Sequence, residues 1–355
     1  MSKWYVFLLS PFFVASTCQA AGAAVTGAGS TAAQLLYSTL GKAYTAGGGS
    51  AVDYQPIGSP AGIAKMRQQA VSFVATDVAP AADTLDKEQL IAFPTAISGV
   101  AVVVNIPGVG SGDVRLTGDV LADIFARKIT KWDDAALVAL NPGVRLPSLP
   151  ISVIVRSDAS GTTFNFTDYL AAASADWRKT RGHAFKITWP ADTVAAKSSD
   201  DVVKTVKDTR GAIGYIDFRY AVDNKLAVAK LRNHDGAFVA PSAAGFAMAV
   251  RNSGWTTQAK FEEPLTDKPG ASTWPITAGT FVLVPRTAEA PEQTIAALKF
   301  FMWSFVHGEK LAQDASFARL PDRVQGRVFA EVTKIKDHDG QPLRWSLTSA
   351  LQSKP

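Results

Sequence analysis

Short apolar runs alternate with helical segments along most of the 355-residue chain. Apolar runs with the length of strands lie at 52–55, 71–75, 100–106, 151–155, 213–217 and 281–284. Segments with a helical pattern lie at 32–44, 60–69, 117–127, 163–173, 200–207 and 293–306. Strands and helices in alternation indicate an α/β fold whose sheets are rich in parallel strands.

The length of the chain favours two lobes, because one hydrophobic core rarely serves so many residues. Beyond the N-terminal segment, no stretch reaches the ~18 apolar residues of a membrane-spanning helix. The formal net charge of +5 is mildly basic for this length. Lys and Arg residues are scattered except for a cluster at 178–181, which is typical of a solvated helix end. The sequence therefore disfavours nucleic-acid binding.

The N-terminal segment has the pattern of a secretory signal. Lys3 precedes an apolar stretch at 4–15, which is too short to span a membrane and is followed by small residues. We therefore expect a signal peptide at 1–23 and an exported mature protein. Its cleavage would remove Cys18, the only cysteine, so neither an internal disulfide nor a thiolate metal site is expected. Lipid anchoring through Cys18 is the less favoured alternative, because residues 15–17 match a lipoprotein signal poorly.

Three turns rich in Gly, Ser and Thr precede predicted helices, at 27–31, 57–62 and 156–163. Backbone N–H groups at a helix N-terminus have no intrahelical partner and attract anions. The third turn contains Arg156, whose planar guanidinium can hold two oxygens of a tetrahedral anion. A single turn of this kind is more simply explained as a helix cap. Three turns and an arginine together indicate an oxyanion site.

Two carboxylates accompany these turns. Asp158 lies two residues after Arg156 and can either orient the guanidinium or form an Asx-type turn. Asp77 follows the predicted strand at 71–75, a position that lines the ligand crevice in α/β proteins, although an isolated aspartate is more often a surface turn residue. A carboxylate repels an anion unless the ligand brings a proton for it to accept. Asp77 therefore favours a protonated oxyanion such as phosphate over sulfate.

Four stretches in these regions resemble the ligand loops of the periplasmic phosphate-binding proteins of Pst-type ABC importers, the PstS family. They are Thr26-Gly-Ala-Gly-Ser-Thr31, Tyr54-Gln-Pro-Ile-Gly-Ser59, Phe73-Val-Ala-Thr-Asp77 and Arg156-Ser-Asp-Ala-Ser-Gly-Thr162. Further similar segments follow in the same order at 100–108, 131–134, 140–143, 211–215, 274–277 and 320–322. Several matches in one order are far more specific than any single loop, and the resemblance covers nearly the whole mature chain.

The resemblance implies a two-lobed periplasmic-binding-protein fold of type II, in which two hinge crossings join the lobes. Lobe I would comprise 24–104 and 278–355, and lobe II would comprise 105–277. The protein would bind one phosphate ion without acting on it, and would need neither cofactor nor metal. The expected phosphate-binding residues are Thr31, Ala32, Ser59, Asp77, Arg156, Ser160, Gly161 and Thr162, with Asp158 orienting the guanidinium.

In these implied roles, hydroxyl, amide and guanidinium groups would donate to the phosphate oxygens, and Asp77 would accept the ligand proton. The chain departs from the family at Ala32, where an aromatic residue is common, and at Pro60, which cannot donate an N–H. The implied partners are inorganic phosphate and the membrane permease with its ATP-binding subunits. We expect a monomer before docking.

Other functions account for fewer residues. The pattern G-x-G-x-x-A at 27–32 suggests a dinucleotide site, but the strand before it would be very short. Ser160 could be the nucleophile of a secreted hydrolase, but it lacks the flanking glycines of a nucleophile elbow. Aromatic residues could stack on a sugar, although packing explains most of them better. Arsenate and sulfate are closer alternatives, and arsenate carries protons as phosphate does. The histidines show no metal-ligand spacing; they are His183, His234, His307 and His338.

Overall fold

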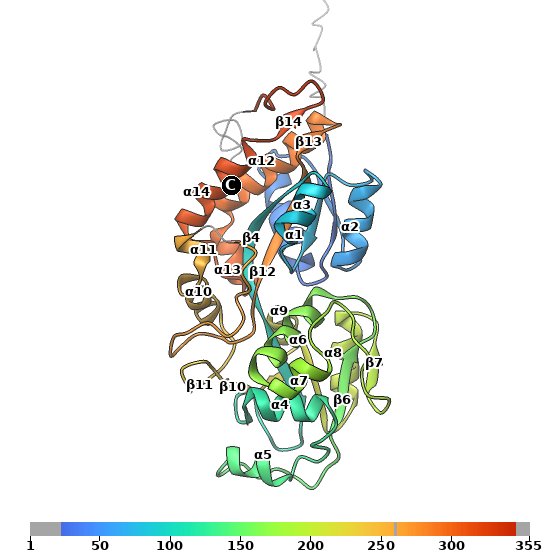
Figure 1. The fold of residues 1–355 in the computed structure, drawn as a ribbon, viewed down its shortest axis with the longest axis vertical. Coiled ribbons are helices and arrows are strands. Elements are labelled where there is room, and N and C mark those ends of the chain that lie inside the picture. Colours follow the sequence, from blue (N-terminus) through green and yellow to red (C-terminus); the bar gives the residue numbers. More distant parts are fainter. Residues whose placement is uncertain (1–22, 259–260, 346–355) are drawn as a thin grey trace, which may run out of the picture.

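The computed structural model of the protein describes residues 23–258 and 261–345. Figure 1 shows two lobes stacked along the long axis of the molecule. We call lobe I the lobe that contains β1 to β3, and lobe II the lobe that contains β6 to β8. Within the described ranges, no helix has both the length and the apolar character needed to cross a membrane.

The elements alternate along the chain as the sequence predicts. The strands are β1 (Val25–Gly29), β2 (Val52–Gln55), β3 (Phe73–Thr76), β4 (Leu90–Asn105), β5 (Arg115–Leu116), β6 (Ser152–Arg156), β7 (Val194–Ala196), β8 (Ala212–Asp217), β9 (Ala227–Val228), β10 (Lys230–Arg232), β11 (Phe238–Val239), β12 (Thr277–Pro285), β13 (Thr287–Ala288) and β14 (Lys336–Asp337). The helices are α1 (Gln34–Ala46), α2 (Ser59–Arg67), α3 (Ala82–Lys87), α4 (Gly118–Phe125), α5 (Ala135–Leu140), α6 (Gly161–Ala173), α7 (Ala175–Thr180), α8 (Ser199–Asp208), α9 (Phe218–Asp223), α10 (Ala243–Arg251), α11 (Gly254–Thr257), α12 (Pro291–His307), α13 (Glu309–Asp314) and α14 (Asp322–Val332).

One sheet extends through both lobes in the order β2-β1-β3-β12-β4-β8-β6-β7. In lobe I, β1 pairs in parallel with β2 and β3. In lobe II, β6 pairs in parallel with β7 and β8. The strands between these groups, β12 and β4, pair antiparallel with their neighbours. The parallel groups confirm the predicted α/β class, and they place the ends of β1, β3 and β6 where ligand loops can begin.

The long strand β4 connects the lobes. Its residues 90–99 pair with β12, and its residues 100–105 pair with β8. The predicted strand at 100–106 covers only the second part, because Pro94 and Thr95 interrupt the apolar run before it. In the structure the register with β12 shifts at this point, with Phe281 opposite Pro94. A bulge disrupts the ladder locally, and it therefore accommodates a residue that has no N–H.

The other predicted strands and helices are confirmed, with shifted ends. The first helix begins at Gln34 and not at residue 32, because the hydroxyl of Ser30 accepts the N–H groups of Ala32 at 3.1 Å and Ala33 at 3.4 Å and holds a turn before the helix. The helix predicted at 163–173 begins two residues earlier, at Gly161. Helices such as α3, α10 and α14 were not among the predicted elements.

The tryptophans mainly fill the cores of the lobes. Trp132, Trp177 and Trp274 are buried, which confirms that packing and not ligand stacking explains them. Each of these indoles also donates to a backbone carbonyl, as a buried Trp usually does. Trp189 is only partly buried, and its Nε1–H donates to the carbonyl of Arg156 at 3.3 Å. Trp189 therefore supports the turn that the sequence assigns to the anion site.

The predicted division at 104/105 and 277/278 remains a prediction. α10 packs against β4 and β12, and α11 packs against α14. This part of the predicted lobe II therefore lies beside elements of lobe I. The predicted signal peptide, apart from Ala23, and Cys18 within it lie outside the described residues.

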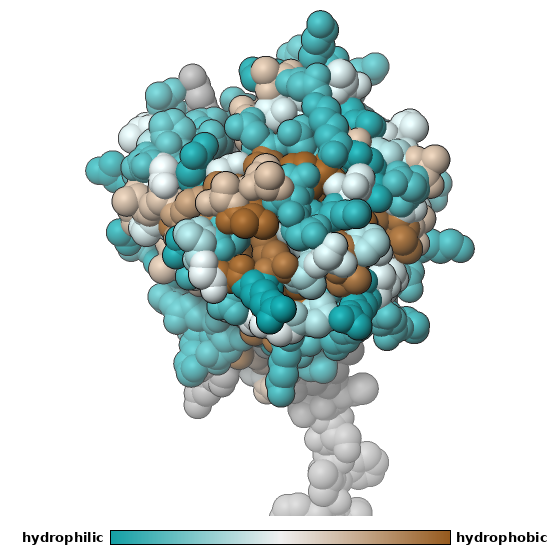
Figure 2. Space-filling view, turned by 90° about the horizontal axis from the view of Figure 1, so that it is seen from below, coloured by the Kyte–Doolittle hydropathy of each residue, from teal (hydrophilic) through white to brown (hydrophobic). Residues whose placement is uncertain are grey.

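Helix α5 lies at the far end of lobe II (Figure 1). The side chain of Asp134 caps it by accepting the N–H of Ala136 at 2.9 Å. Within the helix, Leu137 is buried, whereas Val138 is 50% exposed. Viewed from this end, the surface is largely hydrophilic, with a group of apolar residues near its centre (Figure 2). α5 is therefore a surface helix with a single buried side chain.

Candidate anion-binding site

The predicted site residues lie where parallel strands end. The turn after β1 carries Thr31 and Ala32, the loop after β2 leads to Ser59, and Asp77 follows β3 directly. In lobe II, the turn after β6 leads to α6. The carboxyl ends of parallel strands in an α/β sheet usually form the ligand crevice. Contacts between these loops, described below, bring the residues of both lobes together.

The first turn of α6 lies against the side chain of Asp77. Ser160 is the N-cap residue, but among the described residues its side chain makes no capping hydrogen bond to the helix. Ser160, Gly161 and Thr162 are buried. A Cβ atom at Gly161 would lie 2.7 Å from both Cβ and Oδ2 of Asp77, so only glycine permits this approach. The uncapped helix start and the carboxylate therefore face each other across the lobes.

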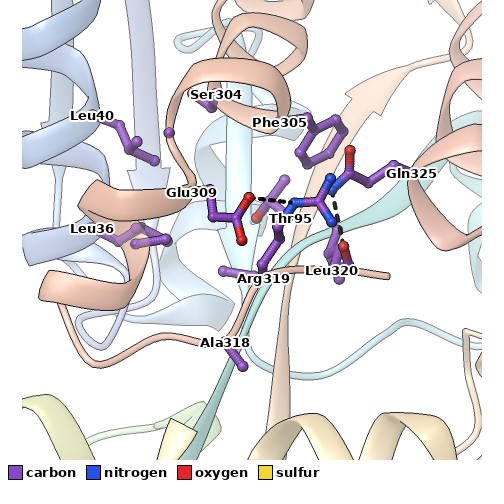
Figure 3. Close-up of a pocket in the computed structure, with 13 residues that line it drawn as sticks. Leu36, Leu40, Thr95, Ser304, Phe305, Glu309, Ala318, Arg319, Leu320 and Gln325 are labelled. Carbon is purple, nitrogen blue, oxygen red and sulfur yellow. Dashed lines mark hydrogen bonds and ion pairs between the residues drawn. The ribbon is translucent and has the colours of Figure 1, made fainter. Parts of the chain in front are cut away.

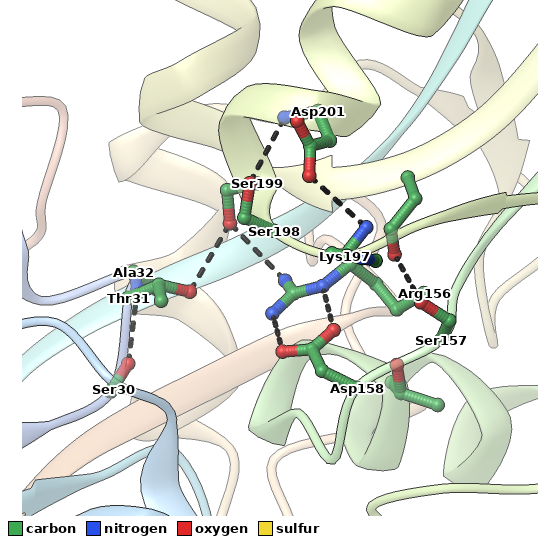
Figure 4. A network of polar contacts seen from close by, with 12 residues as sticks. Ser30, Thr31, Ala32, Arg156, Ser157, Asp158, Lys197, Ser198, Ser199 and Asp201 are labelled. Carbon is green, nitrogen blue, oxygen red and sulfur yellow. Dashed lines mark hydrogen bonds and ion pairs between the residues drawn. The ribbon is translucent and has the colours of Figure 1, made fainter.

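Arg156 supplies a buried positive charge at this place. Its side chain is 1% exposed. Its Nε and Nη2 donate to Oδ1 and Oδ2 of Asp158, each at 2.6 Å, and its Nη1 donates to Oγ of Ser199 at 3.2 Å. Figure 4 shows the guanidinium between Asp158 and Ser199. A buried charge is costly without such partners, and the bidentate pair fixes the plane of the guanidinium.

The backbone of Arg156 is also held in place. Its N–H donates to the hydroxyl of Tyr215 at 3.1 Å, and that hydroxyl shares a hydrogen bond of 2.7 Å with Thr163. The ring of Tyr215 stacks on Phe166 with an interplanar angle of 8°. Strand β8 and helix α6 therefore fix the position of the arginine from two sides.

Asp77 is a buried carboxylate with a raised pKa. Burial raises the pKa of Asp77 to about 6, although the hydrogen bond from Ser30 and the charge of Arg156 act to lower it. Ser30 Oγ lies 2.6 Å from both Oδ1 and Oδ2 of Asp77. The N–H of Asp77 donates to Ser59 Oγ at 3.4 Å. At neutral pH the group is therefore ionised and can accept a proton in a hydrogen bond.

Side-chain contacts join the lobes around these residues. Thr31 Oγ1 shares a hydrogen bond of 3.2 Å with Ser199 Oγ, and the hydroxyl of Tyr220 donates to the carbonyl of Thr31 at 3.2 Å. On the other side, Asn165 Nδ2 donates to the carbonyl of Asp77 at 2.9 Å. The structure thus brings together the loops of all the predicted site residues, whose roles toward a ligand remain predictions.

The residues that connect these loops are not among the predicted site residues. Ser30, Ser199, Asn165 and Tyr220 each contact a predicted site residue or its loop. The sequence could have indicated Ser30, because it lies beside Thr31 in the Gly-rich turn. It could also have indicated Ser199, because this residue directly precedes the helix predicted at 200–207. The other two residues carry no local signal.

A small cavity with a mainly apolar lining lies away from this site, in lobe I. Figure 3 shows Glu309, Arg319 and Gln325 around it, together with Leu36 and Leu40 of α1. Its volume is about 30 Å³, which is room for one or two water molecules. Arg319 Nε lies 3.3 Å from Glu309 Oε2, so the positive charge already has a partner. This cavity is therefore not an alternative anion site.

The sequence matches a known class of protein over most of its length. The PBP superfamily domain matches residues 15–306, so the chain is a member of the PBP superfamily. It is 39% identical to the phosphate-binding protein PstS of Xylella fastidiosa over 306 residues, which cover 86% of this chain and 84% of the relative. It is 38% identical to PstS of Pasteurella multocida over 320 residues, which cover 90% and 93%. The chain belongs to the PstS family of phosphate-binding proteins.

Solved structures confirm the predicted fold. PfluDING, a high-affinity periplasmic phosphate-binding protein with bound phosphate, superposes with a TM-score of 0.70 at 21% identity, covering 94% of this chain and 100% of PfluDING. A phosphate-binding protein from Stenotrophomonas maltophilia gives a TM-score of 0.64 at 20% identity, covering 90% of this chain and 97% of the other. At these identities the comparison establishes the two-lobed binding-protein fold alone.

Proposed function

We propose that this protein binds inorganic phosphate between its two lobes and delivers it to the permease of an ABC phosphate importer. Membership of the PstS family and the geometry of the site support this function. The strongest support is that three groups lie on loops that contact one another. They are a buried arginine, a helix start without a side-chain cap and a buried carboxylate. The positive groups attract the anion, and the carboxylate favours an anion that carries a proton.

Each group has a defined part in binding. The guanidinium of Arg156, held by Asp158, donates to phosphate oxygens through N–H groups that the ion pair does not use. At the start of α6, the hydroxyls of Ser160 and Thr162 and the N–H groups of Gly161 and Thr162 donate to other oxygens. The N–H of Ser160 already donates to the carbonyl of Phe185 at 2.8 Å. In lobe I, hydroxyl and backbone groups on the loops of Thr31 and Ser59 complete the set. Binding requires no covalent chemistry, and we assign the protein no enzymatic activity.

Asp77 determines which tetrahedral anion fits. Its carboxylate accepts the O–H of a protonated phosphate. Sulfate has no proton near neutral pH and would leave two acceptors facing each other in a buried place, which is costly. Arsenate is protonated as phosphate is, so Asp77 does not separate these two anions. The proposed ligand class is therefore a protonated tetrahedral oxyanion, with phosphate as its biological member.

Several further features belong to this proposal. Lobe I comprises 24–104 and 278–355, and lobe II comprises 105–277. The signal peptide at 1–23 directs the protein to the periplasm, where it is a monomer until it docks on the permease subunits that carry the ATP-binding subunits. Opposing lobes that contact each other through Thr31, Ser199 and Asn165 suit a protein that closes on its ligand.

Isothermal calorimetry tests the proposal directly. Protein freed of phosphate is titrated first with phosphate and then, in a separate sample, with sulfate at about pH 8, where Asp77 is ionised. We expect binding heat from phosphate and none from sulfate. Equal heats from both anions would contradict the role of Asp77, and heat from neither would refute phosphate binding itself.

A further inference from the structure

Ser30 makes an unusual set of contacts beside the proposed site. Its Oγ donates to Asp77, lying 2.6 Å from both carboxylate oxygens, and it accepts the N–H groups of Ala32 at 3.1 Å and Ala33 at 3.4 Å. The residue is 1% exposed. Figure 4 shows its hydroxyl directed toward the amide of Ala32. One buried oxygen thus joins a carboxylate at the end of β3 to the amides before α1.

This set of contacts matches that of a protonated ligand oxygen. In the proposed function, a phosphate O–H donates to Asp77, and the N–H of Ala32 donates to a phosphate oxygen. A hydroxyl group both donates and accepts, and Ser30 uses both capacities on these two partners. The ligand and Ser30 therefore require the same carboxylate and the same amide.

We propose that the hydroxyl of Ser30 acts as an internal competitor that holds Asp77 and the Ala32 amide until phosphate replaces it, and so weakens binding and speeds release. This inference rests on the proposed function. It makes Ser30 a residue that tunes affinity, not a ligand-binding residue.

A plain helix cap explains only half of the contacts. A serine that accepts N–H groups two and three residues ahead is a common helix-start motif. Such a cap does not require its own proton to be donated to a buried carboxylate 47 residues away. The effect of Ser30 on the pKa of Asp77, which its hydrogen bond lowers against burial, agrees with a direct link to that carboxylate.

The two roles differ in the sign of their effect on affinity. If Ser30 competes with the ligand, its removal leaves Asp77 and the Ala32 amide unpaired in the free protein but paired in the complex, because phosphate satisfies them. The complex is then favoured. If Ser30 only positions Asp77, its removal disorders the carboxylate and weakens binding.

The experiment compares Ser30→Ala with the original chain. We expect about tenfold tighter phosphate binding in calorimetry, since a hydrogen bond to a charged group contributes on the order of 1.4 kcal/mol, and a release rate slower by a similar factor in stopped-flow measurements. Ser72→Ala is the matched control. Ser72 is also a buried lobe I serine, and it hydrogen-bonds Thr26 at 3.1 Å. The control should leave both quantities unchanged.

Unchanged or weaker phosphate binding by a folded Ser30→Ala protein would overturn the inference. A second comparison separates competition at Asp77 from other effects: in an Asp77→Asn background, Ser30→Ala should tighten binding clearly less than it does in the original chain. An equal gain in both backgrounds would also contradict the inference. Failure of the original chain to bind phosphate would instead refute the proposed function, and the inference with it.

Discussion

The protein contains two buried aspartates that are alike in their immediate surroundings and differ in what lies beyond them. Asp77 receives a hydrogen bond from Ser30, and Asp217 receives one from Ser98 at 2.7 Å. Burial raises the pKa of Asp77 to about 6 and that of Asp217 to about 7. Considered as single groups, either could be mistaken for a functional carboxylate.

Asp77 and Asp217 differ in the residues that lie beyond these serines. Asp217 ends β8 beside β4 and caps α9, accepting the N–H of Arg219 at 3.0 Å. Asp77 lies opposite Gly161 of the other lobe, within the electrostatic influence of Arg156. A perturbed pKa alone therefore does not identify a binding residue. What favours Asp77 as the proposed binding residue is its position opposite groups of the other lobe that are suited to an anion.

The largest expected difference concerns anion selectivity. Asp77→Asn should reduce the preference for phosphate over sulfate by up to ~10⁴-fold, because an amide can donate to sulfate where a carboxylate cannot. Asp217→Asn should leave the preference unchanged. Calorimetric titration of both variants with both anions measures the two ratios. A similar loss in the two variants would show that burial and not position determines selectivity.

The arginines near these aspartates should differ almost as much. Arg156→Ala should weaken phosphate binding by about 3 to 5 kcal/mol, because a buried charge that pairs with the anion is lost. Arg219→Ala is the control, since its side chain pairs with Asp223 at 2.7 Å and donates to the carbonyl of Asp314, and its backbone N–H still donates to the capping side chain of Asp217. A loss below ~1 kcal/mol for Arg156→Ala would place this arginine outside contact with the ligand.

The free energy of unfolding should also depend on the two aspartates over different ranges of pH. A carboxyl whose pKa is raised on folding stabilises the protein below its unfolded pKa, and this stabilisation is lost as the pH rises through the folded pKa. The loss should be complete near pH 6 for Asp77 and near pH 7 for Asp217. At ~1.4 kcal/mol for each pKa unit, the loss amounts to about 3 kcal/mol for Asp77 and about 4 kcal/mol for Asp217.

Urea denaturation without phosphate between about pH 4 and 8 measures these profiles. Compared with the original chain, Asp77→Asn should gain stability with rising pH up to about 6, and Asp217→Asn up to about 7. The difference between each variant and the original chain reports on the replaced group together with its repulsion of the other, because the charge of Asp77 also raises the pKa of Asp217. Profiles that run parallel to that of the original chain would show that neither carboxyl titrates in this range.

Local patterns were sufficient to predict the alternation of strands and helices, because each element repeats its apolar residues with its own period. They were not sufficient for the first part of β4, where Pro94 breaks the run and a bulge against β12 admits it. α10 also escaped prediction; its sequence is rich in alanine and apolar residues without a clear polar face.

The candidate site could be predicted where its residues form a recognisable local sequence pattern. Turns rich in Gly and Ser before helices, and Arg156 within one of them, indicate an anion site from their own chemistry. Partners that meet only after folding have no such sign. Ser30 and Asp77 are 47 residues apart, and Thr31 and Ser199 are 168 apart, so no periodicity relates them. The second pair joins two lobes, so it forms only after the chain has crossed from one lobe to the other.

The smallest expected effect separates two adjacent serines at the start of α8. Ser199 Oγ accepts from Arg156 Nη1 and shares a hydrogen bond with Thr31 Oγ1, each at 3.2 Å, so Ser199→Ala should remove one contact between the lobes. We expect phosphate release to become roughly fivefold faster, about 1 kcal/mol, with an unchanged association rate. Stopped-flow measurement of both rates tests this.

Ser198 provides the contrast, because its Oγ accepts the N–H of Asp201 at 3.1 Å and caps the helix without contacting the proposed site. Ser198→Ala should lower the free energy of unfolding by ~1 kcal/mol and leave the release rate unchanged. An equal change in the phosphate release rate of the two variants would contradict this prediction. It would show that the start of α8 as a whole, and not the hydroxyl of Ser199, holds Arg156 against the loop of Thr31.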